Sequence, residues 1–299
     1  MTLALNTDIL TSRQSPQKYL RLISEAGFTH LHWCHQWNTD FLYGSAEISQ
    51  IREWLKSYQL KLLDIHGSSG VEKCYFSTEE YQRKAGVELV LNRIRMLREL
   101  DGTGSVMMHI PVDKSIGQSP EEKKLAARQL DSLRKSLDEL LPALEKYQTK
   151  IAVENTRNDS FKIIAAIMQE YPAQYFGITL DTGHANIEEA KGLDRMEEYT
   201  DRLEALHLND NDCSGDLHQP PFLGNLDWER IARMLANSHY PDTCRPLSFE
   251  LAMRNTPYWT AELEAADQPE EKIKDFLADT MSRCQRVEQL YQQALAARQ

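Results

Sequence analysis

Cysteine is scarce in the sequence, and no two cysteines have the spacing of a metal-binding or redox pair. Disulfide frameworks and thiolate zinc sites need such pairs, whereas these residues are scattered singly and are odd in number. We therefore expect neither kind of site, and we expect a protein of the reducing cytoplasm. The five cysteines are Cys34, Cys74, Cys213, Cys244 and Cys284.

Long hydrophobic runs are also missing. No apolar segment approaches the ~20 residues that cross a bilayer, which excludes a membrane bundle and argues against a membrane partner. The segment Met1–Asp8 contains no basic residue and reaches Asp8 before an apolar core forms, so we expect no secretory signal. No Ser/Gly linker or low-complexity tract interrupts the 299 residues, which favours one domain over residues 1–299.

Positive charge is in deficit. The chain has 34 Lys and Arg residues against 45 Asp and Glu residues, and its formal net charge is −11. Proteins bind nucleic acid non-specifically through Lys and Arg that displace counterions from phosphates, so this balance argues against a nucleic-acid partner. Hydrophobic residues make up 41% and charged residues 26%, which is typical of a soluble globular protein with a sizeable core.

What the sequence does contain is a regular alternation of short apolar segments and longer amphipathic ones. We predict strands at Leu3–Asn6, Thr29–Trp33, Lys61–His66, Ser105–His109, Lys150–Glu154, Phe176–Asp181, Ala205–Leu208 and Leu247–Glu250. We predict helices at Ser15–Ala26, Ile48–Tyr58, Thr78–Leu100, Pro120–Tyr147, Asp159–Glu170, Met196–Arg202, Asp227–Ala236 and Ile273–Ala296. Strands that each lead into a helix, about eight in number, are typical of an α/β fold, the (β/α)8 TIM barrel, as a single domain. A doubly wound open sheet is the alternative, but the first strand-to-helix turn lacks its glycine-rich pattern.

Two features depart from this alternation. Pro142 lies inside the longest predicted helix and is expected to kink or divide it. The segment Met253–Pro269 is interpreted as an insertion after the last strand, and residues 270–299 as a C-terminal helix. Tyr258 and Trp259 of the insertion could pack over the barrel mouth or contact a partner chain, and the protein could form a homodimer.

Possible metal ligands gather at the ends of the predicted strands. In a TIM barrel the catalytic groups come from the carboxyl ends of the strands, so this placement predicts a functional site at the barrel mouth. Taken one at a time, a strand-end acid can be a helix N-cap and a strand-end histidine can be a packed side chain. The strand-end residues are His66, His109, Glu154, Asp181, His207 and Glu250, and His184 follows Asp181 by three positions.

The acids at two strand ends need a cation. Glu154 and Glu250 each end an apolar run, and an unpaired buried carboxylate costs several kcal/mol. Together with Asp181 and His207 they form a mostly oxygen donor set, which suits Mn²⁺, Mg²⁺, Co²⁺ or Zn²⁺ and offers no thiolate. Asp216 and His218 form a D-x-H pair that could reach the same mouth from the loop after the seventh strand, because alternate residues of an extended segment point to one side.

The same residues carry a resemblance to a known family. The segments are Ala152-Val153-Glu154-Asn155-Thr156, Leu180-Asp181-Thr182-Gly183-His184-Ala185-Asn186, Leu206-His207-Leu208-Asn209-Asp210, residues 216–228, and Phe249-Glu250. In this order they resemble the xylose-isomerase-like TIM-barrel superfamily, specifically its sugar phosphate isomerase/epimerase group, which shares its fold with endonuclease IV. The resemblance covers nearly the whole chain.

The resemblance implies a metal-dependent isomerase or epimerase acting on a sugar or sugar derivative. A divalent ion would be held by Glu154, Asp181, His207 and Glu250. Glu154 and Glu250 would be catalytic: one removes a proton next to a carbonyl, the cation stabilises the enediolate, and the other carboxylate or the same one returns the proton. His184 would contact the substrate, and His66 and His109 are further candidates for substrate binding.

Three alternatives remain open. A multi-zinc phosphodiesterase like endonuclease IV would use nine ligands, and a sugar-derivative lyase or hydratase would use the same proton abstraction as an epimerase. A non-enzymatic, metal-dependent binding module is the third. Against a DNA-binding enzyme, the loops 6–14 and 35–46 together carry one Arg and no Lys. Candidates for the nine ligands are His66, His109, Glu154, Asp181, His184, His207, Asp216, His218 and Glu250.

The sequence also departs from the family pattern. Isomerase-like members usually have Gly-Glu-Gly in the loop after the seventh strand, where Phe222 and Leu223 precede Gly224 here. Characterised ketose 3-epimerases have an Arg six residues after the His of the seventh strand, and Cys213 stands there. The substrate therefore does not follow from the resemblance.

Two aromatic residues and two histidines in and after the second strand complete the candidates. Trp33 and Trp37 could provide an apolar floor for a sugar. His30 and His32 share one face of the strand, so one of them could line the mouth, but a packed and hydrogen-bonded rim is the favoured interpretation.

Overall fold

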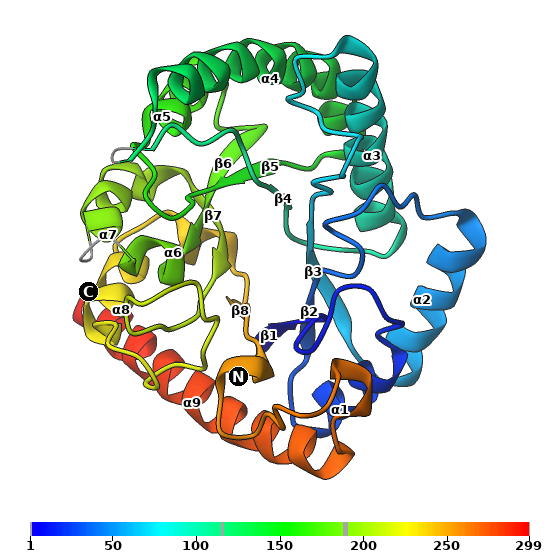
Figure 1. Cartoon of the computed structure of the whole chain (residues 1–299). Helices are drawn as coiled ribbons and strands as arrows, with labels where there is room; N and C mark the ends of the chain where they lie inside the picture. The colour runs from blue at the N-terminus through cyan, green and yellow to red at the C-terminus, as the bar shows by residue number, and fades with distance from the viewer. Residues whose placement is uncertain (1, 115–116, 188–190, 299) are drawn as a thin grey trace.

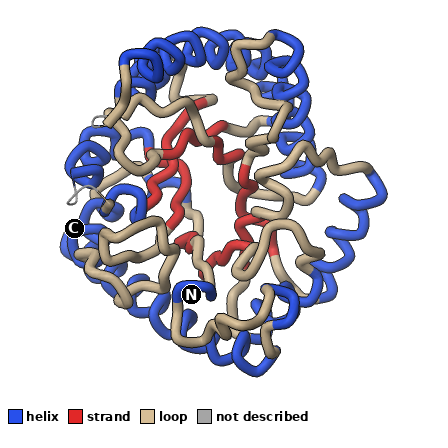
Figure 2. The backbone as a smooth tube through the Cα atoms, viewed as in Figure 1, coloured by secondary structure: helices blue, strands red, loops and turns tan. Residues whose placement is uncertain are grey.

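Eight parallel strands form a ring enclosed by helices, as the computed structural model shows for residues 2–114, 117–187 and 191–298 (Figures 1 and 2). The strands are β1 (Leu3–Asn6), β2 (His30–Trp33), β3 (Lys61–His66), β4 (Val106–Met108), β5 (Ile151–Glu154), β6 (Phe176–Asp181), β7 (Leu203–His207) and β8 (Leu247–Phe249). They pair in the order β7-β6-β5-β4-β3-β2-β1-β8. Met1 and Gln299, which belong to predicted segments, lie outside the described residues.

Helices lie outside the ring (Figure 2), and they follow the strands in the sequence. The α-helices are α1 (Gln17–Glu25), α2 (Ser45–Ser57), α3 (Glu80–Glu99), α4 (Pro120–Tyr147), α5 (Lys162–Glu170), α6 (Thr182–Asn186), α7 (Lys191–Met196), α8 (Trp228–Ala236) and α9 (Glu270–Ala297). Short 3₁₀ helices occur at Glu197–Arg202, Tyr240–Thr243, Met253–Asn255 and Ala265–Asp267. The predicted TIM barrel is therefore confirmed.

The ring is nearly closed between β7 and β8. Leu208, just after β7, donates its backbone N–H to the carbonyl of Ser248 at 3.0 Å, and Glu250 donates to the carbonyl of Leu208 at 3.2 Å. Leu208 and Phe249 form one isolated parallel bridge, whereas the other neighbouring strands share longer ladders. This narrow seam carries His207 on one side and Glu250 on the other.

Alternation of side chains along the strands separates the site from the hydrophobic core. Val153, Leu180 and Phe249 are at most 1% exposed and belong to the hydrophobic core. The next residue along each strand, Glu154, Asp181 or Glu250, points to the opposite side because successive side chains of a strand alternate. The apolar runs that made these segments recognisable as strands thus also direct the acids into the barrel.

Most predicted boundaries agree with the structure, and the differences have local causes. Helix α4 runs through Pro142 without dividing, and Ser119 caps its first turn by accepting a hydrogen bond from the Glu122 N–H at 3.2 Å. The helix predicted from Asp159 starts only at Lys162, because Phe161 has a left-handed backbone (φ 60°) that cannot continue a helix. The segment Glu197–Arg202 is a 3₁₀ helix, and α6 and α7 were not predicted.

The insertion after β8 packs beside α9. The ring of Tyr258 lies 6.1 Å from the ring of Phe276 on α9. The Trp259 ring faces the Arg254 guanidinium at 5.4 Å. Tyr258 therefore takes part in intramolecular packing.

Within the described residues, no helix has both the length and the apolar character needed to cross a lipid bilayer.

Gly86 on α3 lies against the backbone of the loop that supports His109. A Cβ at this position would lie 2.1 Å from the Tyr75 backbone nitrogen, and Tyr75 donates its hydroxyl to the His109 carbonyl. We expect Gly86→Ala to lower the free energy of unfolding by about 3 kcal/mol, because a packed backbone must move to admit the methyl group. Urea unfolding measures this change. Gly215→Ala is the matched control, since nothing lies within 4 Å of its added Cβ, and an equal loss in both variants would contradict the prediction.

Asp159 is a buried carboxyl whose ionisation should weaken the fold. One oxygen accepts the Phe161 N–H at 2.7 Å, the other has no partner within the described residues, and burial raises the pKa of Asp159 to about 6. The native protein therefore keeps this proton up to about pH 6, whereas the unfolded chain releases it near pH ~4, so stability falls as pH rises between these values.

Asp159→Asn should remove that loss of stability. The amide oxygen can still accept the Phe161 N–H, and it never ionises. We expect the variant to gain up to about 3 kcal/mol over the wild type at neutral pH and almost nothing near pH ~4. Urea unfolding at both pH values measures the difference, and a gain that is independent of pH would contradict the explanation.

Candidate active site

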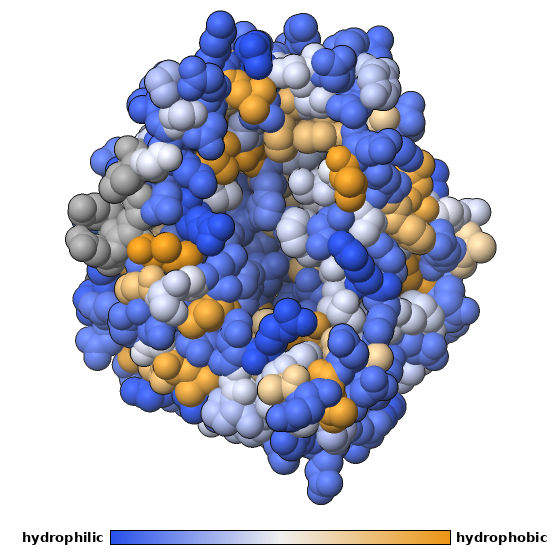
Figure 3. All heavy atoms as spheres, in the orientation of Figure 1, coloured by the Kyte–Doolittle hydropathy of each residue, from blue (hydrophilic) through white to orange (hydrophobic). Residues whose placement is uncertain are grey.

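The centre of the ring is hollowed, and hydrophilic side chains line the hollow (Figure 3). Glu154, Asp181, His207 and Glu250 come from or directly follow β5, β6, β7 and β8, and each offers one atom within 4.8 Å of the others. Their exposed fractions are 1%, 0%, 0% and 8%. The structure therefore brings together four side chains that the strand ends predicted as a group.

The closest contacts of this group centre on one imidazole nitrogen. His207 Nδ1 lies 2.9 Å from Glu154 Oε1 and 3.0 Å from Glu250 Oε2. Adjacent ligand atoms of a six-coordinate ion with bonds of about 2.1 Å lie about 3 Å apart. Three carboxylates and one imidazole, buried together at these separations, fit a divalent cation in both chemistry and spacing.

Asp181 is held in place by its neighbours. Its Oδ1 accepts the His184 N–H at 2.7 Å, which caps helix α6, and its Oδ2 accepts from the Asn209 side chain at 3.0 Å. Burial raises the pKa of Asp181 to about 6. Each carboxylate oxygen retains a further lone pair, so these bonds orient Asp181 without using up its capacity as a ligand.

The electrostatics of the group call for positive charge. Burial by itself would lower the pKa of His207, but Glu250 and Glu154 raise it well above its usual range. Burial would raise the pKa of Glu154, and the charges of His207 and His109 bring it well below its usual range. Protons on the imidazoles or a bound cation can provide this charge, and a cation that binds would displace the protons.

A second group lies beside the first. His66, His109 and Glu154 offer ligand atoms within 4.8 Å of one another, and His109 Nε2 is 2.8 Å from Glu154 Oε2. His66 Nδ1 is 2.8 Å from the carbonyl oxygen of Gly67. The Trp37 ring lies 4.3 Å from the His66 ring and 5.3 Å from the His109 ring. Trp37 therefore reaches the mouth, as expected.

A third group adjoins Asp181, with His184 Nδ1 3.7 Å from Asp181 Oδ1. Asp216 bridges two histidines: its Oδ2 is 3.1 Å from His184 Nε2, and its Oδ1 is 3.0 Å from His218 Nε2. His184 Nδ1 is 3.6 Å from Glu154 Oε1. All nine candidate residues of the sequence thus lie in one mouth: the first two groups share Glu154, and the third adjoins them through contacts of His184 with Glu154 and of His218 with Glu250.

The loop after β7 is anchored by Asp210. This carboxylate accepts the Trp228 indole N–H at 2.9 Å, the Phe222 N–H at 2.8 Å and the Leu226 N–H at 3.2 Å. A Cβ on Gly224 would lie 2.1 Å from the Asn211 carbonyl oxygen, so this position needs glycine. These contacts fix the segment that carries Asp216 and His218.

Sequence reasoning missed some residues of the mouth. His32 is packed and hydrogen-bonded, as favoured, with its Nδ1 2.7 Å from Asp64 Oδ1, and it also forms a group with His207 and Glu250, which agrees with the alternative that it lines the mouth. Asp8 follows β1 and accepts from the Asn6 amide at 2.7 Å. Burial and the charge of Glu250 raise the pKa of Asp8. One sequence signal could have identified Asp64: it precedes the candidate ligand His66 by two residues, so the two side chains lie on the same side of β3.

The interpretation of Trp33 as part of the floor was wrong. Trp33 is 1% exposed and donates its indole N–H to the Tyr43 hydroxyl at 3.0 Å. Because strand residues alternate sides, Trp33 points opposite to His32 and packs in the core around Tyr43.

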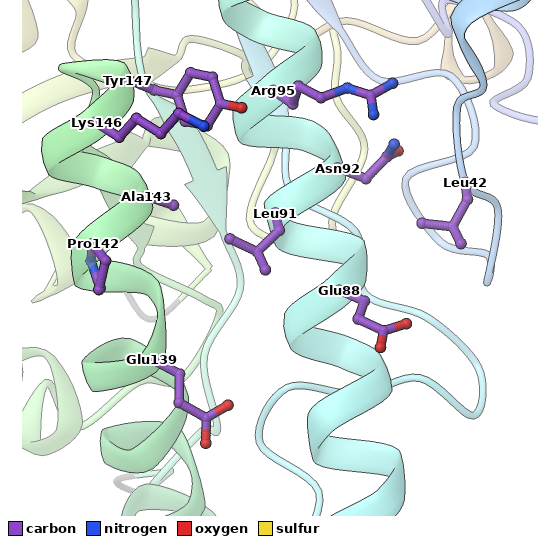
Figure 4. A pocket seen from close by; sticks show the side chains of 10 residues that line it. All are labelled: Leu42, Glu88, Leu91, Asn92, Arg95, Glu139, Pro142, Ala143, Lys146 and Tyr147. Atoms are coloured by element: carbon purple, nitrogen blue, oxygen red, sulfur yellow. The ribbon is translucent and has the colours of Figure 1, made fainter.

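A groove on the outside of the barrel has none of this chemistry. It has a volume of about 550 Å³ and lies between α3 and α4 (Figure 4). Glu88, Arg95, Glu139 and Lys146 line it with apolar side chains such as Leu91, and none of the described residues that line it is a histidine or a cysteine. This groove therefore has no cluster of imidazole or thiolate ligands like the one in the barrel mouth.

Comparison with known proteins agrees with the fold. A family model described as a xylose isomerase-like TIM barrel matches residues 20–288. The chain belongs to this family. The uncharacterised protein y4fM of Sinorhizobium fredii is 30% identical over 256 residues, which cover 78% of this chain and 80% of that protein. A D-psicose 3-epimerase of Enterocloster bolteae is 25% identical over 232 residues, covering 75% and 73%.

Solved structures with the same fold include sugar epimerases. The crystal structure of a D-tagatose 3-epimerase-like protein matches with a TM-score of 0.70 and 18% identity, over 100% of this chain and 99% of that one. A D-psicose 3-epimerase crystallised in the presence of D-fructose matches with a TM-score of 0.66 and 16% identity, covering 96% and 99%. The family thus includes sugar isomerases and epimerases among its structural neighbours.

Proposed function

We propose that the protein is a divalent-metal-dependent isomerase or epimerase of a sugar or sugar derivative. The observation that carries this proposal is the pair of buried carboxylates, Glu154 and Glu250, about one imidazole nitrogen of His207 at 2.9 and 3.0 Å. A carbon acid next to a carbonyl needs a base and an electrophile that stabilises the developing oxyanion. The sugar epimerases among its relatives support this reading.

Glu154, Asp181, His207 and Glu250 would hold the cation. When bound, it would polarise the substrate carbonyl and stabilise negative charge as the neighbouring proton leaves. Without the cation, the charges of His207 and His109 lower the pKa of Glu154, and those of His207 and His218 lower that of Glu250, against the effect of burial. With the cation bound, its charge would take the place of the imidazole protons and keep both carboxylates ionised. Both carboxylates are thus in the form that accepts a proton.

In each glutamate, the oxygen that does not face His207 has a different neighbour. Glu154 Oε2 lies 2.8 Å from His109 Nε2, whereas Glu250 Oε1 has the Cys34 thiol as its neighbour, with Sγ at 3.9 Å. We propose that either glutamate removes the proton and the other returns it to the opposite side of the carbon, which inverts that centre. Return to the neighbouring carbon instead would give an isomer.

The charges around the mouth favour an uncharged substrate. In the described part of the chain, the ion-pair partners of Glu154, Asp181, Asp216 and Glu250 are histidines and include no Lys or Arg. A phosphate group is usually bound by fixed cations. His66 Nε2 would accept a hydrogen bond from a sugar hydroxyl, because its Nδ1–H faces the Gly67 carbonyl oxygen. His109 and His184 would also contact sugar hydroxyls, and Trp37 would form an apolar wall beside them.

A second function, that of a multi-zinc phosphodiesterase, is favoured by the two further groups of possible metal ligands in the mouth. His66 and His109 with Glu154, and His184 and His218 with Asp216, could hold additional ions, as in a multi-zinc phosphodiesterase. A lyase or hydratase would share the first group and differ only in the product.

Metal stoichiometry and isotope exchange test the proposal together. The purified protein is loaded with Mn²⁺ or Zn²⁺ for elemental analysis, then incubated with uncharged ketoses in D₂O and followed by NMR. We expect one tightly bound ion per chain and incorporation of deuterium at the carbon next to the carbonyl. About three ions per chain, together with hydrolysis of phosphodiesters and no exchange, would replace the isomerase by the phosphodiesterase.

A further inference from the structure

Two buried imidazole nitrogens below the mouth lack partners. His32 on β2 and His207 on β7 are both fully buried, and the Nε2 atom of each has no hydrogen-bond partner among the residues that the structure describes. Their ring centroids are 4.4 Å apart, with an interplanar angle of 59°. A buried polar atom without a partner costs about 1–3 kcal/mol, so the arrangement needs a reason.

The other nitrogen of each ring determines what Nε2 can do. His32 Nδ1 lies 2.7 Å from Asp64 Oδ1. A carboxylate accepts hydrogen bonds, so Nδ1 carries the hydrogen and Nε2 of the neutral ring is an acceptor. His207 Nδ1 faces Glu154 and Glu250. When Nδ1 is the metal ligand, the hydrogen is on Nε2, and that N–H needs an acceptor.

We propose that His32, oriented by Asp64, is a positioning residue for His207. In the metal-loaded protein His32 Nε2 accepts the Nε2–H of His207, which fixes the tautomer and the ring orientation that present Nδ1 to the cation. A metal-ligating histidine almost always donates its second ring N–H to an acceptor, commonly a carboxylate, a backbone carbonyl or water; here the neutral His32 imidazole would take that place. The inference rests on the proposed metal site.

The strands bring these three residues together across the barrel. The register between β2 and β3 shifts between Leu31 and His32, and this irregularity aligns His32 with Asp64. The alternative neighbour, His66, lies farther from His207, with ring centroids 6.0 Å apart. Its Nδ1 lies 2.8 Å from the Gly67 carbonyl oxygen, which leaves its Nε2 an acceptor as in His32, so the shorter distance to His207 is what distinguishes His32. His32 is therefore the better placed acceptor.

Metal affinity tests the inference without reference to catalysis. Mn²⁺ binding is measured by competition with a fluorescent chelator for the wild type, His32→Leu and His32→Gln. We expect His32→Leu to bind Mn²⁺ about 10–100-fold more weakly, the usual effect of losing such a partner. His32→Gln, whose amide oxygen can accept, should stay within a few-fold of the wild type.

His30→Leu is the matched control on the same strand. The His30 ring is half-buried and its Nδ1 lies 2.9 Å from the Thr29 hydroxyl, so its loss should leave Mn²⁺ affinity unchanged. Equal affinities for wild type and His32→Leu, or equally weak binding by His32→Gln and His32→Leu, would overturn the inference. A wild type that binds no Mn²⁺ would instead remove the proposed function and this inference with it.

NMR of the wild type covers the case in which the variants do not fold. The protein is labelled with ¹⁵N at histidine and loaded with Zn²⁺. We expect a hydrogen on His207 Nε2, none on His32 Nε2, and a scalar coupling between these nitrogens across the hydrogen bond. A hydrogen on His32 Nε2 would contradict the proposed role.

Discussion

Replacing Glu250 by Gln is expected to lower the rate of deuterium exchange into a ketose by about 10²–10⁴-fold, the range that a positioned general base contributes. The amide keeps the volume of the carboxylate but cannot accept the proton. Glu154→Gln should lose activity to a similar extent, because either carboxylate has to take or return that proton. NMR in D₂O with the ketose that exchanges fastest measures the effect.

The exchange rates of Glu250→Gln and Glu154→Gln test the role of the carboxylates as bases only if part of the metal stays bound. Each glutamine keeps one oxygen as a possible ligand, so elemental analysis should still find metal in both variants. Glu288→Gln is the matched control, because Glu288 is also a buried glutamate, 7% exposed, but lies on the outer helix α9. Exchange within threefold of the wild type in a metal-loaded Glu250→Gln protein would exclude Glu250 as the base.

Removing the metal should have the second large effect. The cation would bind the native arrangement of Glu154, Asp181 and Glu250 and not the unfolded chain, so a strong chelator should abolish exchange and lower the melting temperature. A ligand present at a hundred times its dissociation constant stabilises the native state by about 2.7 kcal/mol, which sets the scale. Calorimetry with and without chelator measures the shift, and Mn²⁺ or Co²⁺ should restore exchange.

Asp181→Asn separates loss of the ion from other actions of the chelator. This variant lacks one charged ligand, so the chelator should change its melting temperature less than that of the wild type. An apoprotein that is as stable and as active as the loaded protein would contradict the metal dependence altogether.

The barrel and the membership of its mouth were largely predictable from sequence. The strands β1, β3 and β6 and the helix α4 match their predicted limits, because continuous apolar runs and a capped amphipathic pattern are strong local signals. The carboxyl ends of parallel strands meet at one edge, so residues that end those runs had to converge there.

The features that could not be predicted from the sequence depend on contacts between distant segments. The pairing of His32 with Asp64 requires the irregular register of β2 on β3, which no local pattern encodes. The position of Trp37 beside His66 depends on the path of the loop after β2. The short α6 begins at the Asp181 cap and is too brief for a periodic pattern to reveal.

The seam between β7 and β8 gives the cation a mechanical consequence. Beyond Leu208 the two strands share few backbone hydrogen bonds, yet His207 and Glu250 face each other across that gap at 3.0 Å. An ion bound by both residues would link β7 and β8 where few backbone hydrogen bonds join them. Loading with metal should therefore slow hydrogen exchange most at the Leu208 and Glu250 amides, so that the cation needed for chemistry would also help to close the barrel.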